Sequence, residues 1–167
     1  MEIKAIVFDW GDTVMRDLPF EGAMKDWPFV AIIPEVKNAI IQLRDKYIII
    51  LASNAGDSSS NDINDALDRV GLKGLFHFVF SSKDIGVEKP NIQFFESIKD
   101  ELKLNPNEII MIGNHCEKDI LGAHNAGWNT IWFNENKAQG ADCYNADASL
   151  YFMSALEELI HKLIKQS

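Results

Sequence analysis

The chain has 167 residues, of which 47% are hydrophobic and 25% charged, a composition typical of one globular domain with a full core. Its 25 Asp and Glu residues outnumber its 16 Lys and Arg residues, and the net charge of −9 argues against a nucleic-acid surface, which needs clustered positive charge. No apolar run approaches the ~20 residues of a membrane span, and the N-terminal one is too short for a secretion signal. We therefore expect a soluble, cytoplasmic protein without a membrane partner.

Short apolar runs rich in β-branched residues alternate along the chain with segments of helical periodicity. The runs predict strands over residues 3–8, 47–51, 76–80, 109–112 and 130–133. The periodic segments predict helices that begin at or near Pro34, Ser60 or Asn61, Pro90, Asp119 and Met153. Strands that alternate with helices are typical of a doubly wound parallel sheet, so we expect a three-layer α/β/α domain over residues 1–167.

Two cysteines, Cys116 and Cys143, stand 27 positions apart. Two are too few for a disulfide scaffold, and their spacing is not that of a metal site. In a reducing compartment we expect both to be free thiols.

Polar residues follow four of the predicted strands. They are Asp9-Trp10-Gly11-Asp12-Thr13, Ser53-Asn54, Glu88-Lys89-Pro90 at the end of a loop, and Gly113-Asn114 followed by Asp119. Each group alone is a weak signal, because Asp, Ser and Asn are ordinary turn formers and most lysines are solvated. Ligands of parallel sheets bind beyond the carboxyl ends of the strands. The order and spacing of all four groups together therefore predict a site at that edge of the sheet.

With these motifs in this order, the chain from Glu2 to about Phe133 resembles the haloacid dehalogenase (HAD) superfamily of aspartyl-nucleophile hydrolases. The stretch from Glu88 through Gly127 is similar to the phosphatase-like branch of that superfamily. The resemblance implies a Rossmann-like core and hydrolysis of phosphomonoesters. A carboxylate nucleophile splits that hydrolysis into two easier steps through an aspartyl-phosphate, and the resemblance assigns this role to Asp9.

The resemblance also implies the roles of the other motif residues. Ser53 and Asn54 would bind substrate, with the Ser53 hydroxyl donating to a phosphoryl oxygen, and Lys89 would offset negative charge. Mg²⁺ is the implied cofactor, since a hard cation takes oxygen ligands. Its implied ligands are Asp9, the backbone carbonyl of Gly11, Asn114 and Asp119, the last through a bound water or by orienting Lys89.

Two positions depart from the phosphatase pattern. Gly11 stands where that pattern has the Asp that protonates the leaving group, and glycine cannot do so. Asp12 is the neighbouring candidate, although a shift by one residue should point its side chain elsewhere. Asn114 stands where the pattern has Asp, and its amide oxygen can ligate a cation without bringing charge. The expected result is a weak phosphatase, or one that needs an acidic leaving group.

These departures leave two alternatives. Carbon–halogen hydrolysis uses the same Asp nucleophile without a leaving-group acid or a metal. Against it, the spacing of Asn114 and Asp119 fits the phosphatases, and Arg16 is the only arginine between Thr13 and Pro34 that could bind a halide. The other alternative is a non-catalytic HAD-fold protein that binds a phosphoryl ligand or a partner, because a fold does not guarantee an activity.

Segment 14–33 is short and lacks periodicity, and we expect it to be a minimal cap insertion. Residues 54–88 leave no room for a second insertion, so the site should be open. An open site suits a small or a bulky phosphorylated substrate, or closure by a neighbouring subunit of a homo-oligomer. His115 and Trp10 adjoin the motifs; we expect His115 to line the site or lie exposed, and Trp10 to wall the pocket or pack in the core.

Overall fold

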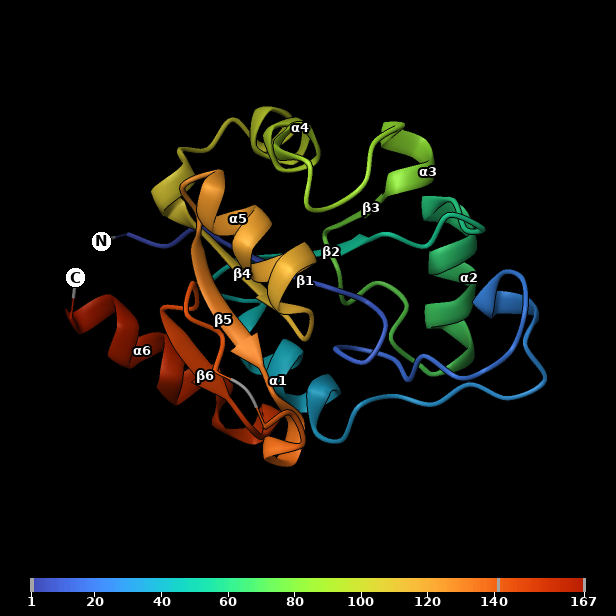
Figure 1. The fold of residues 1–167 in the computed structure, drawn as a ribbon. Helices are drawn as coiled ribbons and strands as arrows, with labels where there is room; N and C mark the ends of the chain where they lie inside the picture. The colour runs from blue at the N-terminus through green and yellow to red at the C-terminus, as the bar shows by residue number, and fades with distance from the viewer. Residues whose placement is uncertain (1, 141, 167) are drawn as a thin grey trace.

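The computed structural model describes residues 2–140 and 142–166. Within these residues, one parallel sheet holds six strands in the order β3-β2-β1-β4-β5-β6 (Figure 1). The strands are β1 (Ala5–Phe8), β2 (Ile48–Ser53), β3 (Phe78–Ser81), β4 (Ile109–Gly113), β5 (Asn129–Phe133) and β6 (Ala148–Leu150). The α-helices are α1 (Val36–Leu43), α2 (Ser60–Arg69), α3 (Ser82–Ile85), α4 (Ile92–Leu102), α5 (Gly122–Asn125) and α6 (Leu156–Gln166).

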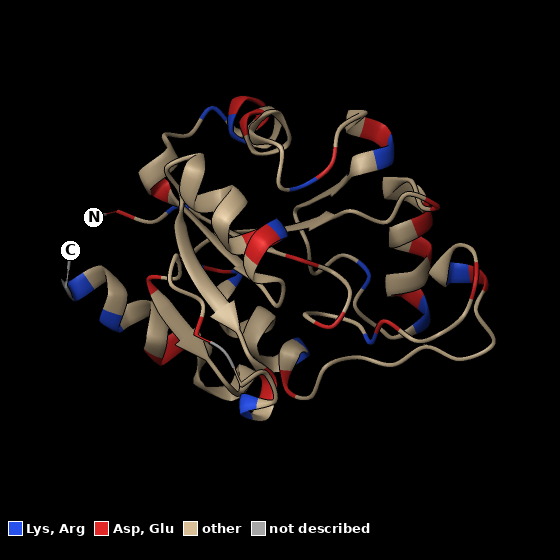
Figure 2. Cartoon of the chain, in the orientation of Figure 1, with Lys and Arg blue, Asp and Glu red and all other residues tan. Residues whose placement is uncertain are grey.

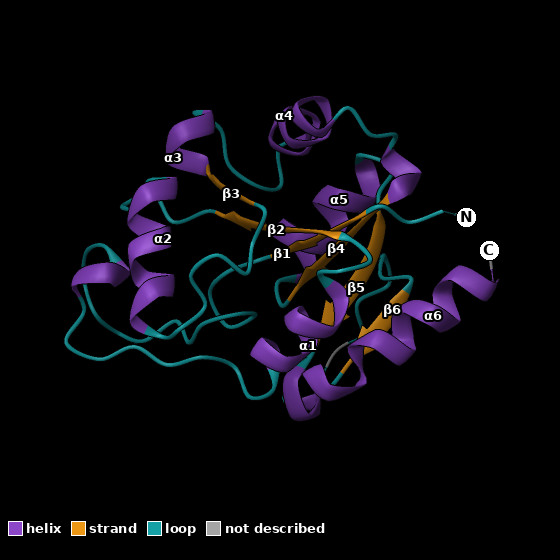
Figure 3. Ribbon diagram, turned by 180° about the vertical axis from the view of Figure 1, so that it is seen from behind, coloured by secondary structure: helices purple, strands orange, loops and turns teal. Residues whose placement is uncertain are grey.

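The sheet is covered on both faces, and the alternation of side chains along β1 shows how. Ile6 and Phe8 are buried in one apolar cluster with residues of α1, α2 and α6, whereas Ala5 and Val7 are buried in a second cluster with residues of α4 and α5. Figure 3 shows the same sandwich from behind, with α4 and α5 on one side of the strands and α1 and α6 on the other. The predicted doubly wound three-layer architecture is confirmed.

Three local predictions were wrong. Strand β6 was not predicted, because three residues, one of them a serine, make no apolar run. Helix α3 lies in what was expected to be a loop. The fourth predicted helix begins three residues early, at Cys116, as the π-helix η3 (Cys116–Leu121) that continues into α5. These elements are short, so tertiary contacts rather than local periodicity set them.

Segment 14–33 follows β1 along the chain, and its two ends pair with each other. Met15 pairs with Ile32, and the Ile33 amide donates to the Val14 carbonyl, so the two ends of the segment lie together. Between them the chain runs out beside α2 (Figure 1) and forms the 3-10 turn η1 (Met24–Asp26). Other short turns are η2 (Pro106–Glu108), η4 (Glu135–Lys137) and η5 (Met153–Ala155).

Cys116 and Cys143 form a disulfide, with their Cα atoms 5.8 Å apart, so the prediction of two free thiols was wrong. Cys116 follows β4, and Cys143 lies between β5 and β6. Because β4 and β5 are parallel neighbours, the chain returns to the same end of the sheet after each of them. This proximity depends on strand order, which the spacing of the two cysteines does not reveal.

The helices and the surface charges bear on which partners the protein could have. No helix within the described ranges is both long and apolar enough to cross a bilayer. Figure 2 shows Lys and Arg scattered over several elements and interspersed with Asp and Glu. The positive residues do not gather on one part of the molecule in this view.

Candidate active site

Strand register brings the predicted residues to one edge of the sheet. Phe8, the last residue of β1, pairs with Leu51 of β2 on one side and with Ile112 of β4 on the other. The residues just beyond these pairs therefore lie side by side at the carboxyl ends of the strands. Strand β1 is also where the strand order reverses, the place where sheets of this kind bind ligands.

A cavity of about 500 Å³ opens at this edge. Every residue predicted for the site lines it: Asp9, Gly11, Ser53, Asn54, Lys89, Asn114 and Asp119. The predicted residues therefore meet in one cavity, and the sequence did not indicate what each of them contacts inside it.

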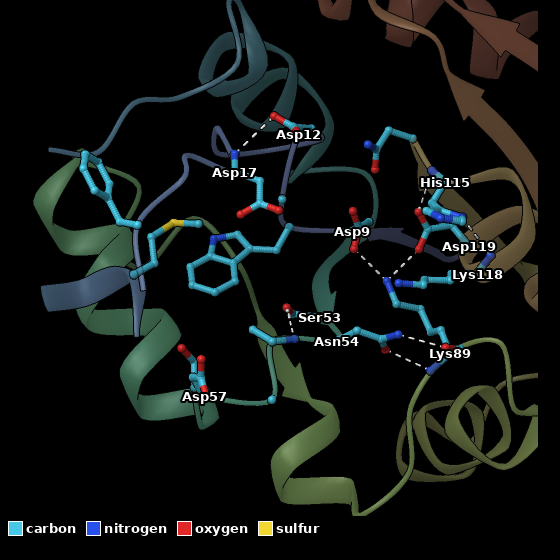
Figure 4. A pocket seen from close by; sticks show the side chains of 18 of the residues that line it. Asp9, Asp12, Asp17, Ser53, Asn54, Asp57, Lys89, His115, Lys118 and Asp119 are labelled. Atoms are coloured by element: carbon cyan, nitrogen blue, oxygen red, sulfur yellow. Dashed lines mark hydrogen bonds and ion pairs between the residues drawn. The ribbon is translucent and has the colours of Figure 1, made fainter. Parts of the chain in front are cut away.

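Lys89 is the buried centre of the site, with 2% of its surface exposed. Its ammonium group lies 2.7 Å from Asp9 Oδ1 and 2.7 Å from Asp119 Oδ1 (Figure 4), and it also donates to the Ala52 carbonyl at 3.0 Å. Burial by itself would lower the pKa of Lys89, but Asp119 and Asp9 outweigh burial and raise it. Lys89 is therefore a permanent cation held against two carboxylates.

Asp119 is almost completely buried, and burial, followed by the nearby charge of Asp9, raises the pKa of its carboxyl to about 6. Both of its oxygens accept hydrogen bonds, Oδ1 from Lys89 and Oδ2 from the His115 amide at 3.0 Å. This arrangement suits Asp119 better to orienting Lys89 than to binding a cation directly. Gly113 makes it possible, because a Cβ at that position would lie 2.4 Å from Asp119 Cγ.

Asn54 and Ser53 play different parts at the end of β2. The Asn54 side chain accepts from the Lys89 amide and donates to the Lys89 carbonyl, each at 2.8 Å, so it fixes the backbone that carries the lysine. The Ser53 hydroxyl accepts from the Ala55 amide at 3.0 Å, which leaves its proton free to be donated to a ligand oxygen. Ser53 lies in the cavity as a donor, and Asn54 acts on the site through Lys89.

Oxygen atoms that suit a hard cation gather around Thr13. Its hydroxyl lies 3.2 Å from Asp9 Oδ2 and 3.3 Å from Asn114 Oδ1. Within the described ranges no group of three or more His, Cys, Asp and Glu residues forms a metal site. Asp9 and Asp119 together carry two negative charges against the single positive charge of Lys89. A carboxylate, an amide oxygen and one excess negative charge fit a divalent cation such as Mg²⁺.

Asp17 is a cavity residue that sequence reasoning missed. A Cβ on Gly11 would lie 3.3 Å from Asp17 Cβ and 3.7 Å from Asp17 Oδ2, so the Asp17 side chain fills the space beside the glycine. Partial desolvation raises the pKa of Asp17, and the charges of Asp12 and Asp9 raise it further. No periodicity marks Asp17, since it lies in an irregular segment; the missing side chain at Gly11 was the only available hint.

The remaining residues near the motifs have structural roles as well. Asp12, with φ of 53°, turns its carboxylate back to accept from the Asp17 amide at 3.1 Å. Trp10 both lines the cavity and is buried, and its indole N–H has no partner among the described residues. His115 is exposed, lines the cavity, and accepts from the Lys118 amide at the start of η3.

A profile of the haloacid dehalogenase-like hydrolase family matches residues 14–133. Over 114 residues the chain is 33% identical to a glyceraldehyde 3-phosphate phosphatase of Methanopyrus kandleri, a match that covers 68% of this chain and 48% of that protein. Over 101 residues it is 34% identical to the pyrimidine 5′-nucleotidase YjjG of Escherichia coli, covering 59% of this chain and 43% of that protein. The chain therefore spans about half or less of the length of these curated relatives.

A solved structure extends the likeness to the whole fold. The crystal structure of an uncharacterized protein from Listeria monocytogenes serotype 4b matches 98% of this chain and 99% of its own, with a TM-score of 0.85 and 20% identity. At this identity the likeness concerns the fold alone. The family profile covers most of the chain and the motif residues meet in one cavity, so this chain belongs to the haloacid dehalogenase-like hydrolase family.

Proposed function

We propose that this chain is a phosphatase-type hydrolase that cleaves phosphomonoesters with Asp9 as the nucleophile. The observation that carries the proposal is the buried lysine that contacts both Asp9 and Asp119 at 2.7 Å beside an open cavity. Two relatives named as a phosphatase and a nucleotidase support this class of reaction.

The chemistry follows from where the side chains lie. An oxygen of Asp9 attacks phosphorus, the bond from phosphorus to the ester oxygen breaks, and an aspartyl-phosphate forms; water then cleaves the acyl-phosphate and regenerates Asp9. The Lys89 ammonium group holds Asp9 Oδ1 by a hydrogen bond and offsets the charge that builds up on the phosphoryl oxygens, and the Ser53 hydroxyl donates to one of those oxygens. Asn54 and Asp119 hold Lys89 in place from two directions.

Mg²⁺ is the cofactor that we propose. When bound, it offsets the negative charge where a carboxylate and a phosphoryl group must meet. Asp9, the Gly11 carbonyl and the Asn114 amide oxygen would hold it, with Asp119 contributing through a bound water. Because Asn114 brings no charge, we expect weaker Mg²⁺ binding than an aspartate at this position would provide.

Dehalogenation receives less support. The Arg16 guanidinium is bound by both carboxylate oxygens of Glu135, at 2.5 and 2.7 Å, and Arg16 is not one of the described residues that line the cavity. A halide ion would have to displace Glu135 from this pair. A non-catalytic, ligand-binding role is the other alternative, and turnover measurements decide between it and hydrolysis.

The cavity volume favours a small phosphorylated substrate, because pockets for small molecules span roughly 300–1,000 Å³. We propose that segment 14–33 serves as a minimal cap, since its residues Phe20, Met24 and Trp27 line the cavity together with the residues at the strand ends. Closure of the site by a second copy of the chain, and a location in the cytoplasm, stay predictions.

The test is phosphate release from p-nitrophenyl phosphate with and without Mg²⁺. We expect turnover that EDTA abolishes and Mg²⁺ restores, and a loss of at least about 10³-fold in Asp9→Asn. Asp57→Asn removes an equal charge from the same cavity without touching Lys89 and should keep the activity. Metal-independent hydrolysis of 2-chloropropionate would instead make the chain a dehalogenase, and phosphate binding without turnover of any phosphorylated metabolite would make it a binding protein.

A further inference from the structure

Breaking the bond from phosphorus to an alcohol oxygen leaves an alkoxide, which needs a proton from a nearby acid. At the position two residues after Asp9, Gly11 has no side chain to supply one. The proton donor for the proposed phosphatase reaction must therefore be another group that lines the cavity and faces Asp9.

Asp17 fills the space that a side chain at position 11 would enter. Its Cβ, Cγ and Oδ2 lie 3.3, 3.6 and 3.7 Å from the position of a Cβ built on Gly11. Figure 4 shows its carboxylate directed into the pocket on the side of Asp9, above Ser53. An acidic oxygen thus lies near the place that the glycine leaves empty, although it comes from six residues along the chain.

The backbone around Asp17 is held at several points. The Asp17 amide donates to Asp12 Oδ1 at 3.1 Å, and the amide of the preceding Arg16 donates to the Ala31 carbonyl at 2.9 Å. The Arg16 side chain is fixed by its bidentate pair with Glu135 beyond β5. These contacts tie the residues before Asp17 to three other parts of the chain, so the carboxylate projects from an anchored backbone.

Three other possible proton donors of the cavity are less well placed. Asp12 is the nearest in sequence, but its carboxylate turns back to the Asp17 amide, away from Asp9 in Figure 4. His115 accepts a hydrogen bond from the Lys118 amide. In Figure 4 it lies beside Asp119, across the Lys89 contacts from Asp17. Lys89 is committed to Asp9 and Asp119.

We propose that Asp17 is the general acid and base of the phosphatase reaction, a role that rests on the proposed function. As the Asp9–phosphorus bond forms, the proton of the Asp17 carboxyl passes to the departing alcohol oxygen and the alcohol leaves. In the second step the Asp17 carboxylate takes a proton from water as the water oxygen bonds to phosphorus. The bond between the Asp9 oxygen and phosphorus then breaks, and phosphate is released. Asp17 is then protonated again, and the cycle balances.

Two esters that differ in their need for an acid test this role. The alkoxide of glycerol 2-phosphate needs a proton, whereas p-nitrophenolate leaves readily without one. In Asp17→Asn we expect kcat/KM for glycerol 2-phosphate to fall about 10²–10⁴-fold and kcat/KM for p-nitrophenyl phosphate to fall much less, because kcat/KM reports the first step and not the hydrolysis of the aspartyl-phosphate that both esters share. The matched control is Asp57→Asn, an exposed carboxylate of the same cavity, which should keep the ratio of the two rates.

A second variant exchanges the two residue types. Gly11→Asp combined with Asp17→Gly returns a carboxyl to position 11 and removes the side chain that would crowd it at 3.3 Å. We expect this double variant to regain activity toward glycerol 2-phosphate, at least tenfold over Asp17→Asn. Circular dichroism and thermal melting of each variant verify that the fold is retained.

The outcomes distinguish a failure of the role proposed for Asp17 from a failure of the proposed phosphatase function. If the wild type hydrolyses both esters and Asp17→Asn keeps the wild-type kcat/KM on both of them, Asp17 is not the acid and the inference is overturned while the proposed function stands. An equal loss on both esters in Asp17→Asn also overturns it, because that pattern indicates a structural role. A wild-type chain that hydrolyses neither ester, with or without Mg²⁺, contradicts the proposed function and the inference with it.

Discussion

Two parts of the cavity lining are built in different ways. One part, the floor, consists of Asp9 after β1, Ser53 at the end of β2, Lys89 before α4 and Asp119 within η3. The other part, the wall, consists of Phe20, Met24 and Trp27, which come from segment 14–33. The floor is held by strand pairing and buried charge, whereas the wall is held by the packing of the buried Met24 and Trp27 side chains and by polar contacts with α2.

The wall is attached to α2 by two cations. Arg69 Nη1 donates to the carbonyls of Lys25 at 2.9 Å and Trp27 at 2.7 Å, and Lys25 forms an ion pair with Asp62 at 2.7 Å. Phe20 packs edge-on against Trp27 with the ring centroids 5.6 Å apart. Opening the wall would expose the buried Met24 and Trp27 side chains but would break no strand pairing of the sheet, so we expect it to open more easily than the floor.

The largest effect should come from breaking the charge network of the floor. Lys89→Met leaves Asp9 and Asp119 without their cation in a buried setting, and the free energy of unfolding should fall by about 3–5 kcal/mol. Urea denaturation measures this change. Lys73→Met removes the exposed ion pair with Asp68 and should cost at most about 1 kcal/mol. Equal losses in both variants would mean that the floor is no more dependent on its charges than the surface is.

A smaller effect is expected where the wall meets α2. Arg69→Ala removes the donor to the wall carbonyls, and the free energy of unfolding should fall by about 1–2 kcal/mol. If the proposed function holds, KM should rise more than kcat falls, because the wall contacts substrate but not the reacting bond. Arg44→Ala loses a hydrogen bond to the Gly74 carbonyl, and because neither residue is among the described residues that line the cavity, it should leave KM unchanged. A rise in KM for Arg44→Ala as large as that for Arg69→Ala would contradict this account.

The smallest effect concerns the pH dependence of the same attachment. Lys25, and then the hydrogen bonds of the helix-capping Ser59, hold the pKa of Asp62 well below its ordinary value of 3.8. A carboxyl whose pKa is lowered by folding stabilises the fold above its unfolded pKa. That contribution is lost as the pH falls from the unfolded pKa through the lower pKa of the folded state. The melting temperature of Asp62→Asn should therefore lie below that of the wild type at pH 7, and the difference should shrink between about pH 4 and pH 2. A difference that stays constant over this range would show that the charge of Asp62 is unimportant.

The floor was largely predictable from the sequence, and the reason is local. A buried parallel strand needs a continuous apolar run, and each run here ends at a polar residue that marks the carboxyl end of a strand. Asp9, Ser53 and Asn114 could be assigned to one edge of the sheet on this basis alone. Lys89 was harder, because its burial depends on two carboxylates that lie 80 and 30 residues away.

The wall and its neighbours could not be predicted in the same way. Segment 14–33 has no periodicity, so the sequence did not indicate that Asp17 lies beside Gly11 or that Arg69 holds the chain at Trp27. The disulfide between Cys116 and Cys143 was missed for a related reason, since it follows from the order of β4 and β5 in the sheet. The contact of the Asn54 amide with the backbone of Lys89 was not predicted either, and the binding of substrate by Asn54 stays a prediction.

By itself the sequence determined the layers, the strand ends and which polar residues lie at them, because apolar runs and the residues that end them are local properties of the chain. Only the tertiary structure decided which side chain fills the space beside Gly11, which cysteines meet and what Asn54 contacts. Those outcomes depend on distances between segments that irregular or parallel connections bring together. The candidate acid, Asp17, belongs to this second group.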